Sequence, residues 1–231
     1  MIAWLLDPAN WSGPNGIPLR LAEQVGISAV SLLIAASIAL PIGVWIGHTG
    51  RGANLAVNLA NIGRAIPSLA AIGLVVPITQ AIDPDLGFRV YPTLFAMIIL
   101  AIPPILVNAY AGVSGVDREL VEASRGMGFR ERQILGRVEI PIALPVIGGG
   151  LRSAAVQVIA TATLGALFGF GGLGRYLVDG VAQNDDGQLY GGVFLVAALA
   201  LVAEGGFALL QRGLTSPGLR RAESSGRAEP A

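Results

Sequence analysis

The stretch GVSGVDRELVEASRGMGFRERQILGRVEIPIALP, residues 112–145, decides the fold class because it is a long polar insertion between two apolar runs. One run, Tyr91–Tyr110, precedes it, and another, about Ser153–Phe170, follows it. A bilayer core about 30 Å thick needs roughly 20 apolar residues per helix, and each run approaches that length. We therefore interpret the stretch as a loop that connects two membrane-spanning helices.

The polar stretch itself predicts a helix-turn-helix. Asp117 can cap a helix that continues to Arg125 and that the glycines at positions 126 and 128 then end. A second helix can follow over residues 129–138, before Pro141 stops it. A rigid polar element of this kind, held between two membrane spans, is suited to dock in a groove of a soluble partner. An ordinary solvated loop is the alternative interpretation.

Three further apolar runs continue the pattern along the chain, at Ile27–Gly47, Ile66–Ile82 and Tyr190–Leu210, of which the second is short. The chain is 53% hydrophobic and 13% charged, whereas soluble domains average about 45–50% and about 25%. Prolines lie within or beside the runs, but neighbouring helices of a membrane bundle can satisfy the carbonyls that prolines free. The sequence therefore predicts an all-α integral membrane protein with about five transmembrane helices.

Missing residue types exclude several functions. All 15 basic residues are arginines and cysteine is absent. Without lysine the chain has no Walker A lysine and cannot form a Schiff base, so it cannot hydrolyse ATP by the P-loop route. Without cysteine it has no disulfide and no thiolate metal site. A net charge of zero, with no basic stripe along any face, argues against a nucleic-acid partner.

The arginines predict an orientation, because loops rich in arginine stay in the cytoplasm. The loop at 112–144 and the tail at 212–231 carry most of them and are both expected inside. We expect an external amino-terminal segment, 1–26, a transmembrane domain over 27–211 with its cytoplasmic loop at 112–144, and a disordered cytoplasmic tail over 212–231. The amino terminus is then outside and the carboxyl terminus inside. Residues 17–25 are compatible with a surface helix or with part of a further span.

Within the polar stretch, Glu122-Ala123-Ser124 precedes Gly128 by three residues, and Val138, Ile140 and Pro141 follow after nine more. This spacing resembles the cytoplasmic motif of ABC importer permeases, which reads E-A-A, three residues, Gly, nine residues, Ile, one residue, Leu-Pro. The third residue is Ser instead of Ala, and two fixed positions hold apolar relatives. The resemblance covers about residues 58–210. Within this class of permeases, the sequence is similar in particular to the betaine, choline and carnitine permeases.

The resemblance implies a MetI-like fold and the role of channel-forming permease in an ATP-driven importer of glycine betaine, choline, carnitine or proline. The coupling helix that docks on the ATPase would comprise Glu122, Ala123, Ser124, Arg125, Gly126, Met127, Gly128 and Phe129, with the motif ending at Val138, Ile140 and Pro141. ATP and magnesium would be bound by that ATPase, and no cofactor by this chain. Further partners would be a second permease, identical or homologous, and an extracytoplasmic binding protein. The location would be the bacterial plasma membrane.

The fourth apolar run and the glycine-rich turn after it are candidates for the translocation path or its outer gate. Small residues allow close helix contact there, and threonines can form hydrogen bonds across it. The candidates are Thr161, Thr163, Gly169, Gly171, Gly172 and Gly174. Tight packing and a simple flexible turn are the alternatives. The turn GFGGLG matches the dinucleotide fingerprint in letters only, because no strand precedes it.

Arg152 and Glu204 are the ionisable residues most clearly at membrane depth or at its margin, and such residues are functional candidates. Arg152 is expected within a turn or two of the cytoplasmic face, to which its side chain can extend. Glu204 could pair with Arg152 or with Arg64. Structural pairing is the favoured interpretation, and substrate contact is the alternative.

Two other classes of function remain open. A secondary transporter driven by an ion gradient would usually contain an internal repeat, and the sequence shows no strong one. An intramembrane serine protease could use Ser114, in the sequence Gly-Val-Ser-Gly, with His48, the single histidine. Aromatic residues, which would form a cage for a quaternary ammonium group, make up 6% of the chain and do not cluster at membrane depth. The sequence therefore leaves the choice among osmoprotectants open.

Overall fold

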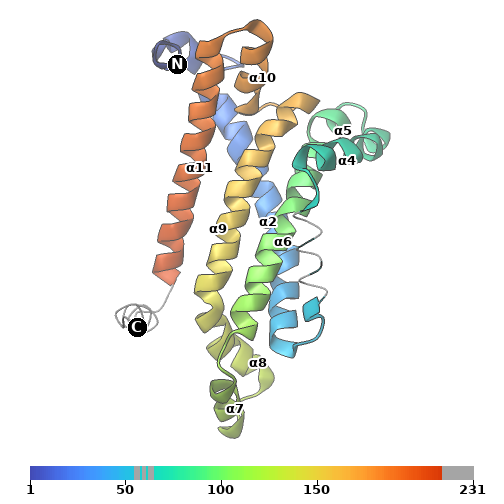
Figure 1. Ribbon diagram of the computed structural model, residues 1–231, viewed down its shortest axis with the longest axis vertical. Helices are drawn as coiled ribbons and strands as arrows, with labels where there is room; N and C mark the ends of the chain where they lie inside the picture. Colours follow the sequence, from blue (N-terminus) through green and yellow to red (C-terminus); the bar gives the residue numbers. More distant parts are fainter. Residues whose placement is uncertain (55–57, 59–60, 62–64, 215–231) are drawn as a thin grey trace.

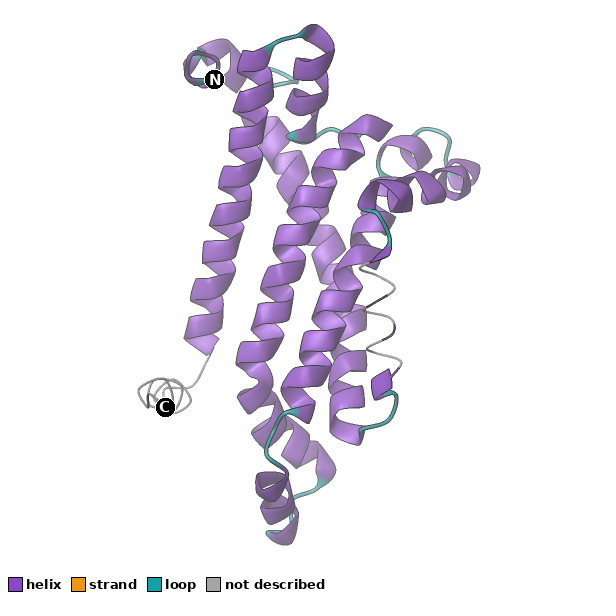
Figure 2. Cartoon of the chain, in the orientation of Figure 1, coloured by secondary structure: helices purple, strands orange, loops and turns teal. Residues whose placement is uncertain are grey.

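The computed structural model describes residues 1–54, 58, 61 and 65–214, and every regular element within them is a helix. Four long helices form a bundle (Figures 1 and 2): α2 (Ile17–Thr49), α6 (Tyr91–Ser114), α9 (Ile140–Leu164) and α11 (Asp186–Leu214). Each contains most or all of one predicted apolar run, and all four are long and apolar enough to cross a membrane. The prediction of an all-α membrane fold is confirmed.

The remaining predicted run, Ile66–Ile82, corresponds to the shorter helix α4 (Ser68–Ile82). Its 15 residues make it about 22 Å long, less than the bilayer core of about 30 Å. Ile72 of α4 packs with Ala96 of α6 and with Leu164, the last residue of α9. The four long helices and this shorter one together account for the five runs.

Helix α2 starts earlier than its apolar run predicts. Residues 17–25, expected as a surface helix or part of another span, are instead the first turns of α2, which runs unbroken for 33 residues. Pro18 in its first turn suits a helix start. Glu23 and Gln24 interrupt the apolar pattern because they bond to the distant segment 169–174. Glu23 and Gln24 are polar because they make tertiary contacts, so their polarity did not mark the end of the membrane helix as the sequence suggested.

The core lies where α2, α6 and α9 pack together. Small residues allow these helices to approach closely, as the sequence suggested for the fourth run. A Cβ added to Gly43 of α2 would lie 2.7 Å from the carbonyl oxygen of Leu106 on α6, and one added to Gly150 of α9 would lie 2.9 Å from that of Pro104. Between these points, Ala35 and Ala39 of α2 are fully buried. The three helices therefore form one tightly packed unit.

The two ends of the bundle differ. At one end, α7 (Arg118–Gly126) and α8 (Glu131–Ile134) project beyond α2 and α6 (Figure 1), and we call this the α7 end. The opposite end carries α1 (Ile2–Leu6), η1 (Pro8–Trp11), α5 (Leu86–Arg89), α10 (Gly174–Gln183) and the start of α11, and we call it the α10 end.

Aromatic contacts hold the amino-terminal segment against α10. The rings of Trp4 and Tyr176 meet edge to face with centroids 5.0 Å apart. The Tyr176 hydroxyl donates a hydrogen bond of 2.6 Å to the carbonyl of Asn15, and burial raises the pKa of this phenol. Helix α1 and the last turn of α11 lie at opposite ends of the bundle (Figure 1). Of the predicted disordered tail, residues 212–214 belong to α11, and 215–231 lie outside the described residues.

Candidate functional site

The helix-turn-helix predicted for the polar stretch is present at the α7 end. Asp117 caps α7, because its Oδ1 accepts a hydrogen bond of 2.9 Å from the amide of Glu119. After Gly126 the chain turns through Gly128, whose φ of +85° lies in the left-handed region that glycine adopts freely. The amide of Phe129 then donates to the carbonyl of Ser124 at 3.1 Å and closes the turn. Local capping chemistry therefore fixes this element.

The predicted coupling residues differ in exposure. Ser124 is buried, and its hydroxyl donates to the carbonyl of Leu120 at 2.8 Å. Glu122, Ala123, Arg125, Gly126, Met127 and Gly128 are exposed, and Phe129 is half-buried. Met127 is 69% exposed at the tip of the element. Met127 is therefore accessible for contact, although a single exposed apolar side chain is common on protein surfaces and does not by itself indicate a partner.

The end of the motif does not stop the helix as predicted. Glu131 begins a continuous helical run of α8, the π-helix η2 (Leu135–Glu139) and α9. Pro141 lies in the first turn of α9, directly after the π-helix, where the change of hydrogen-bond register tolerates its missing N–H. Val138 and Ile140, the other two motif residues, are half-buried in this junction. The polar element is thus joined to α9 without a flexible break.

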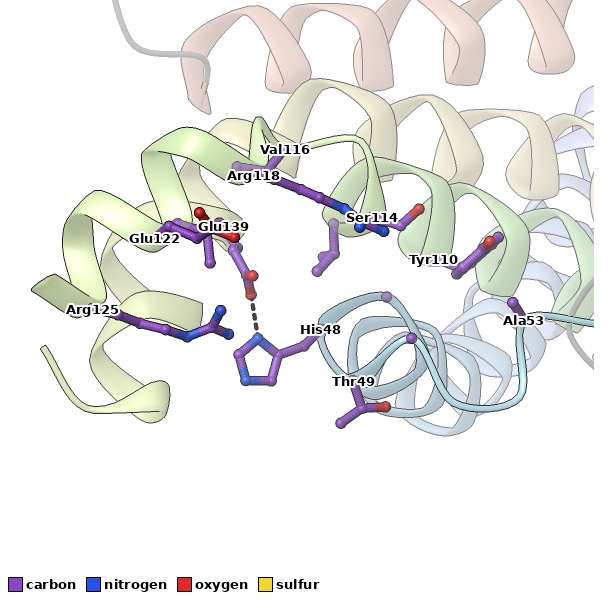
Figure 3. Close-up of a pocket in the computed structure, with 14 residues that line it drawn as sticks. His48, Thr49, Ala53, Tyr110, Ser114, Val116, Arg118, Glu122, Arg125 and Glu139 are labelled. Atoms are coloured by element: carbon purple, nitrogen blue, oxygen red, sulfur yellow. Dashed lines mark hydrogen bonds and ion pairs between the residues drawn. The ribbon is translucent and has the colours of Figure 1, made fainter.

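A cavity of about 400 Å³ lies between the end of α2, the end of α6 and the polar element. Figure 3 shows the polar side chains that line it, among them His48, Ser114, Arg118, Glu122 and Glu139. His48 Nδ1 lies 2.6 Å from Oε2 of Glu139, and Glu139 is only 5% exposed. This contact joins residues 91 positions apart in the chain.

The contact belongs to a chain of polar groups that spans four elements, α2, η2, α8 and α7. His48 Nε2 lies 3.4 Å from Oε2 of Glu131, on α8. Glu131 in turn receives two hydrogen bonds from the guanidinium of Arg125, at 2.8 and 3.1 Å. The hydrogen bond and negative charge of Glu131 raise the pKa of Arg125, so this guanidinium stays charged. The polar element at the α7 end is therefore linked to α2 as well as to the helices that flank it.

This arrangement does not support the serine protease hypothesis. Ser114 and His48 line the same cavity, but both ring nitrogens of His48 face carboxylates. The Ser114 hydroxyl points instead to the carbonyl of Ala111 on its own helix, at 3.5 Å. The sequence identified His48 only as a possible base and missed Glu131 and Glu139. A single histidine at the end of one span and a carboxylate at the start of another were the available signals.

The glycine-rich turn at the α10 end is held by α2. The amide of Gly172, which has a φ of +70°, donates to Oε2 of Glu23 at 2.7 Å. Gln24 is fully buried; its Oε1 accepts from the amide of Leu173 at 3.2 Å, and its Nε2 donates to the carbonyl of Ile159 at 2.8 Å. The sequence predicted none of these anchors, although two polar residues ahead of an apolar run were a signal for them.

The other candidates of the translocation path fall in different environments. Thr161 is buried, whereas Thr163 is half-buried and donates to the carbonyl of Ala160 at 2.6 Å. Gly174 packs so closely on the carbonyl of Thr163 that a side chain there would collide with it. Gly169 has a φ of +82°, and a Cβ at Gly171 would meet the Glu23 carboxylate. The turn is therefore packed and hydrogen-bonded, which differs from the flexible turn that the glycines suggested.

Arg152 and Glu204 form an ion pair. The sequence had suggested either Arg152 or Arg64 as the partner of Glu204. Arg152 Nε on α9 lies 3.1 Å from Oε1 of Glu204 on α11. Arg64, the other possible partner, lies outside the described residues. In the described part of the chain, no group of three or more His, Asp or Glu side chains could hold a metal ion.

Comparison with known proteins identifies the family. Residues 39–216 match the model of the binding-protein-dependent transport system inner membrane component. The carnitine transport permease protein OpuCB of Listeria monocytogenes is 35% identical over 204 residues, 88% of this chain and 90% of the relative. The osmoprotectant import permease protein OsmW of Salmonella typhimurium is 34% identical and covers 95% of this chain and 99% of its own. The choline transport system permease protein OpuBB of Bacillus subtilis is 32% identical over 86% of this chain and 88% of the relative.

The fold likewise matches a solved structure. An inward-facing conformation of the MetNI methionine ABC transporter superposes with a TM-score of 0.75 at 21% identity, over 84% of this chain and 94% of the other. The MetI-like fold inferred from the sequence motif is confirmed. On the evidence of the motif, the bundle and these relatives, the chain belongs to the binding-protein-dependent transport system inner membrane components, the permease subunits of ABC transporters.

Proposed function

We propose that this permease forms the membrane path for a small osmoprotectant of the glycine betaine, choline, carnitine or proline class, delivered by a binding protein. The names of the carnitine, choline and osmoprotectant permeases similar to it support this substrate class. The observation that carries the proposal is the helix-turn-helix of the α7 end, because its motif spacing fits the coupling element of importer permeases.

Residues 122–129 would form the coupling helix that docks in the cleft of an ATPase subunit. The exposed side chains of Glu122, Ala123 and Met127 support this role, since they are free for contact. Closure of two ATPase subunits on ATP and magnesium would move the docked element as a rigid body. The helical run through η2 would pass this motion to α9, and the contact of His48 with Glu139 would pass it to α2.

The membrane orientation follows from the same assignment. The α7 end and the tail after residue 211 would face the cytoplasm of a bacterium, and residues 1–26 would face outside. The concentration of arginines in residues 112–144 supports this orientation. A second permease, identical or homologous, would complete the path, and the binding protein would dock at the α10 end. The turn at 169–174 and Thr163 would then lie near the outer gate.

Reconstitution tests the proposal. The permease, its ATPase and its binding protein are inserted into liposomes, and uptake of labelled glycine betaine, carnitine and choline is measured. We expect uptake that needs ATP and that stops when the ATPase is inactivated. Glu122→Arg should block uptake without impairing membrane insertion, because a reversed charge meets the docking cleft. Glu122→Gln is the matched control and should retain more activity. Uptake driven by an ion gradient without the ATPase would instead establish a secondary transporter.

A further inference from the structure

The Arg152–Glu204 pair lies in the middle of two adjacent membrane helices. Position 152 is the midpoint of α9 (Ile140–Leu164), and Glu204 lies ten residues before the end of α11 at Leu214. The two helices run side by side (Figure 1). An ion pair at this depth has no water or headgroup to solvate it from the lipid side, so its surroundings decide whether it can exist there.

The pair is not sealed between its helices. The side chain of Arg152 is 39% exposed and that of Glu204 is 42% exposed. A pair that served only to join α9 to α11 would be replaceable by well-packed apolar side chains of similar volume with no loss of stability. Two half-exposed charges at mid-membrane therefore indicate that this face does not meet lipid tails in the assembled transporter.

The charges line a groove of about 440 Å³, a volume within the range of small-molecule sites, which is about 300–1,000 Å³. Ser153 and Gln157 add exposed polar groups to its wall, and Gly149 and Ala160 leave room at its two ends. These positions recur every three or four residues, so they share one face of α9. The opposite face, with Ala154 and Val158, is buried in the core of the bundle. Helix α9 thus has a polar face that no described residue of the chain covers.

We propose that this groove is a substrate-contacting half-site for a zwitterion, closed on its open side by the second permease. The inference rests on the proposed function, in which the solute carries an onium group, and in betaine and carnitine also a carboxylate. A guanidinium and a carboxylate held 3.1 Å apart present both complementary charges to such a solute. Arg152 binds the solute carboxylate, and Glu204 faces the quaternary ammonium group. Ser153 and Gln157 supply hydrogen bonds to its remaining polar atoms.

Substrate discrimination tests the assignment of charges. In liposomes that contain the complete transporter, Arg152→Gln should lower uptake of labelled glycine betaine and carnitine at least tenfold. Uptake of choline, which has a hydroxyl in place of the carboxylate, should fall less than threefold. The double variant Arg152→Gln with Glu204→Gln retains a hydrogen-bonded pair of similar size but has no charge. It should keep the melting temperature of the complex and lose uptake of all three solutes. Wild-type uptake of betaine by the double variant would overturn the proposal and leave a purely structural pair.

Labelling of single cysteines tests the groove independently of which solutes are carried, because the native chain has no cysteine. Ser153→Cys should react with a charged, membrane-impermeant thiol reagent, and saturating glycine betaine should slow the reaction. Leu33→Cys is the control, since Leu33 is 70% exposed but lies among apolar residues of α2. If neither cysteine reacts with the thiol reagent, with or without ATP, the proposal is overturned. Absence of ATP-dependent uptake by the wild type would instead contradict the proposed function itself.

Discussion

Replacing His48 with alanine removes the contact that joins α2 to Glu139, at the base of the polar element of the α7 end. In the described part of the chain, Glu139 would then lose its 2.6 Å partner while remaining only 5% exposed. A hydrogen bond to a charged group contributes about 1.5–3 kcal/mol to stability, and a buried charge left without its partner destabilises by about 3–5 kcal/mol. Because both side chains are well buried, 14% and 6% exposed, we expect a loss of about 3 kcal/mol.

Thermal unfolding of the purified permease–ATPase complex measures this loss. For a chain of this size, each kcal/mol shifts the melting temperature by about 2–4 °C, which gives a fall of about 6–12 °C. Thr49→Ala is the matched control, because the neighbouring Thr49 is exposed and its hydroxyl bonds only locally, to the carbonyl of Trp45 and the amide of Arg51. It should change the melting temperature little.

A double-mutant cycle identifies the cause of the loss. His48→Leu combined with Glu139→Leu leaves no unpaired charge, so it should be more stable than His48→Leu alone. Under the proposed function, His48→Leu alone should also hydrolyse more ATP per solute imported, because α2 would no longer follow the polar element at the α7 end. A melting temperature for His48→Ala equal to that of the parent would refute the reasoning. So would a double variant no more stable than His48→Leu.

Two further predictions concern glycines. Gly128→Val should reduce uptake strongly while Gly128→Asn retains most of it, because a β-branched residue is strained at a φ of +85° and asparagine tolerates the left-handed region. Uptake in liposomes distinguishes them, and equal activity would contradict a role for the turn. Gly174→Ala should destabilise by about 1–3 kcal/mol, because its Cβ meets the Thr163 carbonyl. Gly26→Ala, with open space around it, should stabilise α2 by about 0.5–1 kcal/mol; thermal unfolding shows whether the two changes differ in sign.

The parts of the fold that sequence could predict depend on local signals. Hydrophobic runs of span length identified the four long helices and α4. The cap of Asp117 and the turn at Gly128 were predicted because capping and left-handed backbone are properties of a few adjacent residues. The start of α2 at Ile17 could not be predicted in the same way. Its polar turns are stabilised by a segment 149 residues away.

The same limit applies to the candidate site. Motif spacing located residues 122–129, but the link from His48 to Glu139 joins two segments that only the tertiary fold brings together. Arg152 and Glu204 were recognisable as ionisable residues at membrane depth. Their shared groove was not, because the exposure of a side chain depends on which face of each helix its neighbours cover.

The π-helix η2 affects how the polar projection at the α7 end and the groove on α9 are aligned. Residues 135–139 are the only described helical turn of this wider type, and they lie between the polar projection and α9. Each residue of an α-helix advances its neighbours by about 100° around the axis. The wider turn holds about one residue more than an α-helical turn, so deleting one residue from it would restore an α-helical turn and leave Arg152 close to its present direction relative to Glu122. The same deletion within α9 ahead of Arg152 would instead rotate Arg152 by about 100°. This single wide turn therefore accommodates one additional residue between the polar projection and the groove without changing their relative direction.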